Sequence, residues 1–351
     1  MRVTNSMMTY NVLRNINSNS SRLDKILQQT TSEKKVNVAS DDPVAAARIL
    51  KLRSYLSKVE QYEKNTDDAL SWIGISESTL NNVNETIQRI RYLTVEASNS
   101  TVGDEDAEKI KSEILELRAN LLDLANSSYS GRYIFAGYDT DKKPFATETT
   151  AVGEKILYRG QYLSLGGVVP ASVSDSDYEA FVLANAANRV TGDKQEIEYR
   201  IGSSNQISIN EEGFEVFGSN GEGLFDTITK LQLALEGETS YKTAEYSEGP
   251  PASATIVTYE LKIDSVLSDL DKDLNRMLTS RAELGAKYNY LGLVQKRLSS
   301  NSTVFTELLS KNEDIDLDKA AIELMSAKTV YQASLASGAQ VIQNSLLDFI
   351  R

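Results

Sequence analysis

The chain has 351 residues, a net charge of −13, and neither cysteine nor histidine. The length allows two or three domains. The absence of cysteine excludes disulfides, thiol nucleophiles and thiolate zinc sites, and the absence of histidine removes the commonest general base and metal ligand. Most of the excess acid lies between Gly166 and Pro251, with 15 acidic and 5 basic residues. Because no cluster of lysine and arginine appears, the sequence predicts no nucleic-acid partner.

Residues 1–35 carry apolar side chains spaced by threes and fours, which indicates one face of a helix. Their other positions are rich in asparagine and serine, whose side chains compete for backbone hydrogen bonds and weaken helices. Such a helix is marginal alone and needs a partner. From this stripe we expect four residues at an assembly interface: Val3, Met7, Tyr10 and Leu13.

A long helix is predicted to begin after residues 40–43, where Asp42 is expected to be the cap and Pro43 the first helical residue. The alternative for the adjacent carboxylates Asp41 and Asp42 is a metal site, but we predict neither a metal nor a cofactor. Apolar residues then recur every seventh position in two rows, which favours a helix that runs to about Ser98. A second helix is expected from Asp104.

The pattern changes at Tyr129, where helical spacing gives way to short alternating segments. Of the 19 glycines, 12 fall between Gly153 and Gly249. This predicts a turn-rich, mostly β domain. We expect strands at residues 133–135, 155–159, 196–201 and 206–209, and one short helix at Leu224–Leu235.

Every seventh residue from Ile256 to Phe305 is apolar, and the run contains no proline. This predicts one helix of roughly 75 Å that begins just after Pro251. Residues 329–347 carry no charge but are too polar to cross a membrane. A helix with apolar residues on several faces is expected to be buried, here against copies of the chain. The residues assigned to this interface are Ile322, Met325, Ala333, Ala336, Ile342, Leu346 and Phe349.

The predicted fold is mainly α with a β-rich insert. The N- and C-terminal segments form a long coiled-coil-like helical rod, to which a β hairpin and a central mixed, mostly β outer domain are added. The terminal helices, 1–44 and 312–351, are expected to be disordered in the monomer. Residues 45–160 and 252–311 form the rod domain with its hairpin, and residues 161–251 form the acidic outer domain. This architecture suits an assembly subunit better than an enzyme.

Several segments resemble the flagellin superfamily. Residues 1–5, residues 39–46 and the rod helices are similar to its amino-terminal region. Residues 131–137 are similar to the hairpin of its hook–filament junction members rather than to most flagellins. Residues 305–310 and 331–335 fit the same assignment, whereas residues 161–193 depart from the pattern and look like an insertion.

The resemblance implies a non-catalytic structural subunit of the bacterial flagellum, secreted by the flagellar type III export apparatus. Its partners would be copies of itself, hook-associated protein 1, flagellin and, before export, a cytoplasmic chaperone. Three alternatives stay open. They are a filament-forming flagellin; a cytoplasmic coiled-coil adaptor, which does not explain the β domain; and a glycosidase, which would need its acids in an apolar cleft rather than in glycine-rich sequence.

Overall fold

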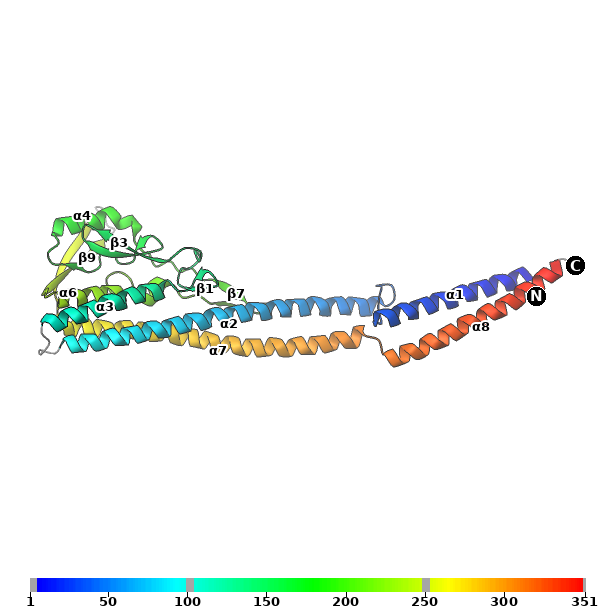
Figure 1. Ribbon diagram of the computed structural model, residues 1–351. Helices are drawn as coiled ribbons and strands as arrows, with labels where there is room; N and C mark the ends of the chain where they lie inside the picture. The colour runs from blue at the N-terminus through cyan, green and yellow to red at the C-terminus, as the bar shows by residue number, and fades with distance from the viewer. Residues whose placement is uncertain (1–4, 99–103, 248–252, 350–351) are drawn as a thin grey trace. The chain divides into compact units, whose positions relative to one another are not determined.

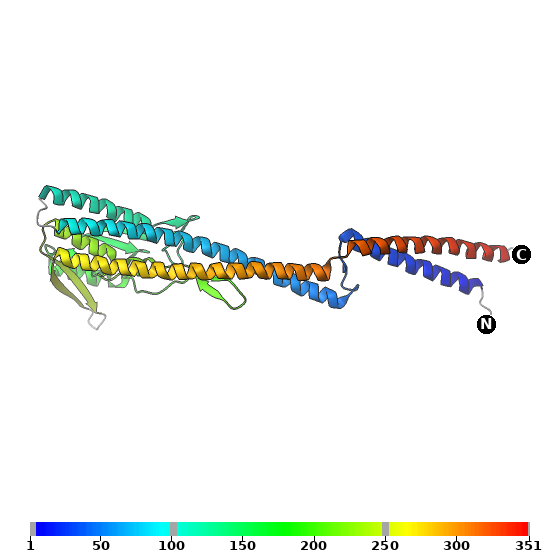
Figure 2. The same cartoon turned by 90° about the horizontal axis from the view of Figure 1, so that it is seen from below.

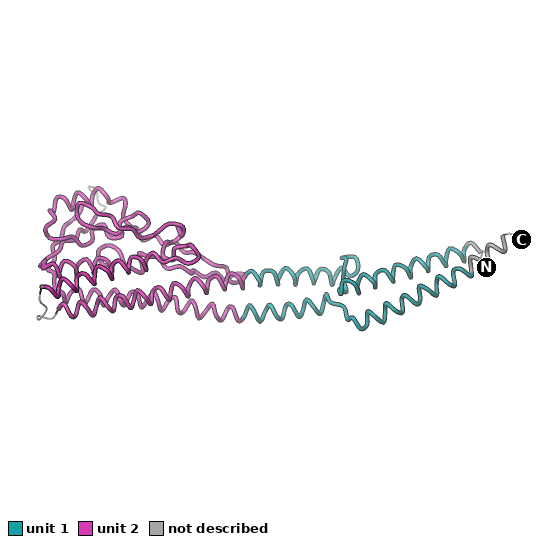
Figure 3. Tube along the Cα trace, in the orientation of Figure 1, with its two compact units in different colours: residues 1–61, 297–351 teal, residues 62–296 magenta. Residues whose placement is uncertain are grey.

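The computed structural model describes residues 5–98, 104–247 and 253–349, and their side chains within 7–98, 105–247 and 253–340. It is mainly helical, with long helices at both ends of the chain and a central β-rich region (Figure 1). The chain divides into two compact units, which Figure 3 colours: residues 1–61 with 297–351, and residues 62–296. We call them the terminal unit and the central unit. The finer three-part division remains a prediction.

In the terminal unit, α1 (Asn5–Ser32) and α8 (Leu317–Phe349) lie side by side in both views (Figures 1 and 2). Their less exposed side chains alternate at spacings of four and three, as in a coiled coil. Three of these residues on α8 are small, namely Ala320, Ala327 and Gly338. We call this contact the terminal seam; it comprises Val12, Ile16, Asn19, Leu23 and Ile26 on α1, and Ala320, Leu324, Ala327, Tyr331, Ser334 and Gly338 on α8.

A short antiparallel bridge ties the end of α1 to the start of α8, between Lys34 and Asp314. The backbone N–H of Lys35 donates to the carbonyl of Glu313 at 2.7 Å. The buried Glu313 carboxylate forms ion pairs with Arg53 and with Lys34, the latter at 2.5 Å. The hydrogen bond from Arg53 holds the pKa of Glu313 below its ordinary value. Charge pairing therefore fixes the chain where α7 ends and α8 begins.

The two longest helices, α2 (Pro43–Ala97) and α7 (Ile263–Glu313), each run from one unit into the other. Their heptad positions are the buried ones. On α2 the row includes two threonines, Thr66 and Thr94, whose hydroxyls donate to the carbonyls four residues earlier, so these polar groups are satisfied. The buried heptad residues are Val59, Thr66, Ile73, Leu80, Ile87 and Thr94 on α2, and Leu270, Met277, Leu284, Leu291 and Leu298 on α7.

Two ion pairs of the central unit show that α2 and α7 are antiparallel: Arg281 to Glu77 and Arg91 to Asp271, both at 2.8 Å. Two further helices pack together beside them, α3 (Asp104–Ala125) and α6 (Leu224–Leu235). The limits predicted for α6 are confirmed at both ends. On α3, Ile114 and Leu121 are fully buried.

The prediction that the last long helix starts just after Pro251 is wrong. Ile256 lies in strand β10 (Ser253–Glu260), which pairs with β9 (Ser240–Ser247), and α7 begins only at Ile263. The segment is rich in β-branched residues that favour a pleated sheet, and β9 supplies its partner. The apolar residue seven positions before Ile263 is therefore coincidental.

The hairpin after α3 is shorter than predicted: β1 (Ser128–Tyr129) pairs with β2 (Arg132–Tyr133), joined by Ser130 and Gly131. Both turn residues have positive φ, as a tight primed turn requires, so glycine suits the second position. Residues 134 and 135 are buried but lie outside the strand.

The remaining strands form small antiparallel sheets. The predicted strands near residues 155, 198 and 206 are present, although each is one or more residues shorter or shifted. The elements are β3 (Phe145–Thr150), β4 (Gly153–Tyr158) and β5 (Gln161–Tyr162) in one sheet, β6 (Val169–Pro170) beside β9 in another, and β7 (Glu198–Arg200) with β8 (Gln206–Ser208) in a third. Short helices between them are α4 (Asp175–Asn185), the 3-10 turn η1 (Ala186–Asn188) and α5 (Gly213–Phe217).

Residues 161–193, which look like an insertion, are part of the core of the central unit. Tyr178 and Val182 on α4 are fully buried against Ala244 of β9 and Ala254 of β10. The Tyr178 hydroxyl donates to the carbonyl of Gly167 at 2.5 Å. The segment is thus not an appendage, because its side chains cover one face of the β9–β10 hairpin.

Candidate assembly interface

The apolar side chains expected at the interface are exposed wherever the structure describes them. Ile322 and Met325 are 70% and 75% exposed. Met7, Tyr10 and Leu13 on α1 and the small residues Ala333 and Ala336 on α8 are exposed as well. Val3 lies outside the described residues, and so do the side chains of Ile342, Leu346 and Phe349.

On α8 the exposed Ile322 and Met325 lie opposite the terminal seam, whereas Leu317, Val330 and Leu335 flank it. At 3.6 residues per turn, Asp318, Ile322, Met325, Thr329 and Ala336 share one face. As a group they point about half a turn away from the mean direction of the seam residues. We call these five residues the outer face of α8. The helix therefore has one side occupied by α1 and a second, apolar side that nothing within the described chain covers.

On α1 the predicted stripe divides into two. Ile16 and Leu23 belong to the terminal seam, whereas Met7, Tyr10 and Leu13 remain exposed. The prediction that they share one face is wrong because successive steps of three residues rotate around the helix by about 60° each. Only alternating steps of three and four hold a position on one side.

Adjacent acids order the entry into α2. Asp42 accepts hydrogen bonds from the backbone N–H groups of Val44 and Ala45 at 3.0 and 2.9 Å, so it caps the helix at Pro43. Asp41 pairs with Lys25 at 3.1 Å. The hydrogen bond from Lys25 lowers the pKa of Asp41. Both carboxylates thus have structural partners.

Large exposed apolar side chains are concentrated in the terminal unit. Nine lie between Met7 and Tyr55 and seven between Val304 and Leu335, although this unit is the smaller of the two. A surface of this kind, on a chain that buries its other apolar residues well, is typical of a protein–protein contact. The sixteen residues are Met7, Met8, Tyr10, Leu13, Leu27, Val38, Val44, Leu50, Tyr55, Val304, Leu308, Leu317, Ile322, Met325, Val330 and Leu335.

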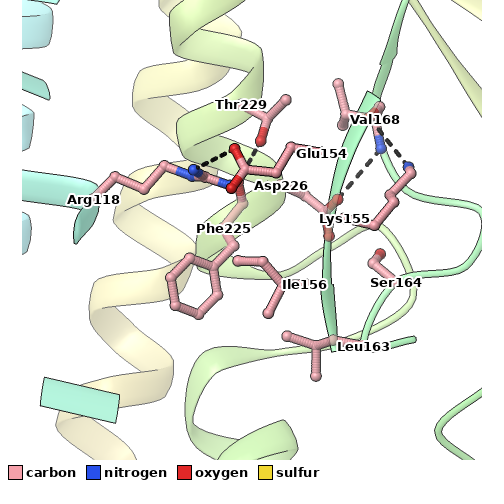
Figure 4. Close-up of a pocket in the computed structure, with 10 residues that line it drawn as sticks. All are labelled: Arg118, Glu154, Lys155, Ile156, Leu163, Ser164, Val168, Phe225, Asp226 and Thr229. Carbon is pink, nitrogen blue, oxygen red and sulfur yellow. Dashed lines mark hydrogen bonds and ion pairs between the residues drawn. The ribbon is translucent and has the colours of Figure 1, made fainter. Parts of the chain in front are cut away.

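Figure 4 shows a small polar hollow in the central unit, of about 20 Å³. Lys155 lies there, and its ammonium donates to the carbonyls of Gly167 and Val168 at 3.1 and 3.4 Å. Burial lowers the pKa of Lys155 to about 8. Asp226 accepts from the N–H of Val168 at 3.3 Å. A hollow of this volume has room for about one water molecule, and is far smaller than a substrate pocket.

The described ranges hold neither a metal-binding cluster nor a membrane-spanning helix. No group of three or more acidic, histidine or cysteine side chains is placed to hold a metal ion there. None of the helices described is both long and apolar enough for a membrane span.

Residues 3–140 match the family model described as the bacterial flagellin N-terminal helical region. The chain is 27% identical over 346 residues to flagellar hook-associated protein 3 of Escherichia coli (strain K12), with 95% of each chain covered. The chain is therefore similar along nearly its whole length to a protein of the flagellin superfamily. Another member of this superfamily, the flagellin of Bacillus subtilis (strain 168), is 24% identical over 347 residues, with 98% of this chain and 97% of that protein covered.

A solved structure shares the flagellin-superfamily fold. It is described as a putative flagellar hook-associated protein from Vibrio parahaemolyticus. The TM-score is 0.57 at 17% identity, with 78% of this chain and all of that chain covered. The likeness shows that this chain and that protein share a fold.

Sequence reasoning missed two features of the terminal unit. Gly338 allows close packing at the seam: a Cβ there would lie 2.9 Å from Ile16 and 3.1 Å from Val12. The first turns of α2 carry exposed basic side chains with no acid between Pro43 and Val59. The alternating four–three spacing of positions 327, 331, 334 and 338 could have indicated the close packing at Gly338. The local charge of residues 43–59, rather than the total charge of the chain, could have indicated the basic side chains of α2.

Proposed function

We propose that the chain is a non-catalytic structural subunit of the bacterial flagellum that joins the hook to the flagellin filament. The observation that carries the proposal is the arrangement of α8, which packs on α1 with one side and leaves Ile322 and Met325 exposed on the other. A monomer gains nothing from such a face. An assembled subunit gains roughly 1.5–3 kcal/mol for each large side chain that it buries there.

The relatives support a place in the flagellum. The match to hook-associated protein 3 covers nearly the whole of both chains, so it includes the terminal helices as well as the centre. On this proposal the subunit is secreted and works outside the cell, between hook-associated protein 1 and the first flagellin subunits. A cytoplasmic chaperone would hold its C-terminal helix before export.

The composition of the terminal seam supports a role for assembly in ordering the ends of the chain. Small residues at Ala320, Ala327 and Gly338 bring the helices close but bury little apolar area. Serine and asparagine contribute at Ser334 and Asn19. We propose that the α1–α8 pair is disordered in the free monomer and is stabilised when neighbouring copies cover its outer faces.

A filament-forming flagellin is the main rival, since the Bacillus subtilis flagellin also matches nearly the full chain. The two functions can be distinguished by which deletion strain the gene complements. Supplying the gene to a strain without its own junction protein should restore filaments attached to hooks. Supplying it to a strain without flagellin should not produce a long filament. A long filament in the strain without flagellin, with no attached filaments in the strain without the junction protein, would show that the chain is a flagellin.

The interface itself can be tested with Met325→Asp and Ala336→Glu, which place a charge on the outer face of α8. An unpaired charge buried there costs several kcal/mol, so both variants should leave hooks bare and flagellin in the medium. Leu183→Asp, on an exposed position of α4 in the central unit, is the matched control and should swim. Normal swimming by Met325→Asp and Ala336→Glu would show that this face is not an assembly contact.

A further inference from the structure

The first turns of α2 carry a basic stripe in an otherwise acidic chain. Residues 43–59 contain four basic residues and no acid. Arg53 is engaged by Glu313. Arg48, Lys51 and Lys58 are exposed, and none of the three forms an ion pair within the described residues.

The three free cations lie on one face of α2. Positions 44, 48, 51, 55 and 58 follow the alternating four–three spacing that holds one side of a helix. Two of these positions are apolar and well exposed, Val44 and Tyr55. We call Val44, Arg48, Lys51, Tyr55 and Lys58 the basic stripe. It combines positive charge with an aromatic ring, a combination that suits an acidic and apolar partner.

The same unit contains a surface of the complementary kind. Asp314, Asp316 and Asp318 are exposed where α8 begins, and Ile322 and Met325 follow on its outer face. Asp316 is engaged by Lys319, whereas Asp314 and Asp318 form no side-chain ion pair within the described residues. On α8, acidic side chains therefore come before the exposed apolar ones. On α2, basic side chains come before Tyr55 in the same order.

We propose that the basic stripe of one copy packs, in parallel, against the start and outer face of α8 of a second copy. This places Arg48 and Lys51 beside the acidic start of α8, and Tyr55 against Ile322. The inference rests on the proposed function and names the contact by which its subunits associate. Charge complementarity selects a copy of the chain as the partner, because both surfaces belong to the same unit.

The two surfaces differ, so the contact is heterologous. Each copy offers its basic stripe to one neighbour and its α8 to another, which generates rings or helical arrays rather than closed dimers. That is the symmetry that a layer between hook and filament requires.

The first experiment reverses charge on each side of the contact. One variant carries Arg48→Glu and Lys51→Glu, and the other carries Asp314→Lys and Asp318→Lys. Assembly of the purified chain, followed by light scattering and sedimentation, should need about a tenfold higher concentration for either variant. Added salt should weaken assembly of the wild type but favour that of the variants, because it screens the new repulsion between like charges. Arg132→Glu with Lys143→Glu changes the charge equally on exposed central-unit positions and is the control.

Mixing the two variants gives the sharper test. In an array in which the two variants alternate, the acidic stripe of one variant faces the basic α8 of the other. The basic stripe of the second variant faces the acidic α8 of the first, so both contacts join opposite charges. An equimolar mixture should therefore assemble near the wild-type concentration, although each variant alone needs about a tenfold higher concentration. A mixture no better than its components, with helicity unchanged by circular dichroism, would overturn the inference.

Cysteine cross-linking gives an independent measurement because the natural chain contains no cysteine. Tyr55→Cys combined with Ile322→Cys should give a ladder of covalent multimers on oxidation, whereas each single change should give none. Attached flagella without such a ladder would refute this contact but leave the proposed function standing. Wild-type chain that neither assembles nor restores filaments would refute the proposed function itself.

Discussion

The central unit and the terminal unit differ in how far they bury their large apolar side chains. In the central unit, Phe145, Tyr158 and Phe217 are fully buried, with ring centroids 5.1 to 5.3 Å from Phe145. Gly213 lies so close that a Cβ there would be 2.5 Å from Phe145. In the terminal unit the seam contains alanine, glycine and serine, while Ile322 and its neighbours remain on the surface.

The difference separates a structure that is complete within one chain from one that we propose is completed by neighbouring copies. Interlocking aromatic rings specify a single packing and exclude water. The terminal seam brings α1 and α8 together through small residues on α8, but it leaves each helix with an unused apolar side. Four substitutions test this comparison, two in each unit.

The largest expected effect is in the aromatic core. Phe145→Ala removes a ring that contacts Tyr158, Phe217 and Phe225, and should lower the free energy of unfolding of the central unit by about 3–5 kcal/mol. Urea titration followed by circular dichroism measures it. Tyr138→Ala, at an exposed position, should change stability by less than about 0.5 kcal/mol. Equal effects would mean that the cluster is not the core.

A pH effect of slightly smaller size is expected at Asp273, which joins α7 to α6 by accepting from Thr227 at 2.8 Å and from Arg276 at 2.7 Å. Burial raises its pKa to about 6, above the usual value of 3.8. The folded state therefore retains this proton to higher pH than the unfolded state, and the contribution of this group to stability falls as pH rises through that window.

Asp273→Asn cannot ionise and should escape this loss. Relative to wild type, the variant should gain roughly 3 kcal/mol in unfolding free energy between pH 4 and pH 7. Urea midpoints at several pH values measure the difference, with Asp271→Asn as a control on the same helix. A difference that is constant with pH would show that Asp273 ionises normally in the fold.

The terminal seam should be sensitive to added volume. Gly338→Val places a side chain against Ile16 and Val12, at a cost of about 1–3 kcal/mol to the α1–α8 pair. Amide hydrogen exchange in assembled material should become faster in α1 and stay unchanged in the central unit. Ser337→Val, exposed on the neighbouring position, is the control. Slow exchange in Gly338→Val would show that the seam accommodates the added methyls.

The smallest effect is expected at the cap of α2. Asp42→Ala removes the acceptor for two backbone N–H groups and should cost about 1 kcal/mol. Asp42→Asn keeps an acceptor oxygen and should lose much less. Thermal unfolding by circular dichroism separates the two variants, and indistinguishable curves would mean that the first turn of α2 is held by other contacts.

Sequence periodicity was sufficient for the long helices, because a helix closes its hydrogen bonds within a few residues. The heptad rows of α2 and α7 predicted which side chains are buried from Val59 to Thr94 and from Leu270 to Leu298. The limits of α6 were also readable from the sequence. For the interface residues the spacing predicted helices, but it did not show which side chains remain exposed or what covers them.

Pairing over long distances was not readable. Ile256 fits the heptad count, yet the segment that contains it pairs with β9 as strand β10. Strand pairing depends on a partner elsewhere in the chain, which the local sequence does not reveal. Residues 161–193 look like an insertion in the sequence, but Tyr178 and Val182 complete the core beneath that hairpin.

The sequence by itself determined the buried heptad rows of α2 and α7 and the excess of acid in the centre, since these are local or compositional properties. Only the tertiary structure decided which stripe of α1 and α8 is used within the chain and which is left exposed. That choice depends on which residues allow two helices to approach closely, and at Gly338 the absence of a side chain settles it.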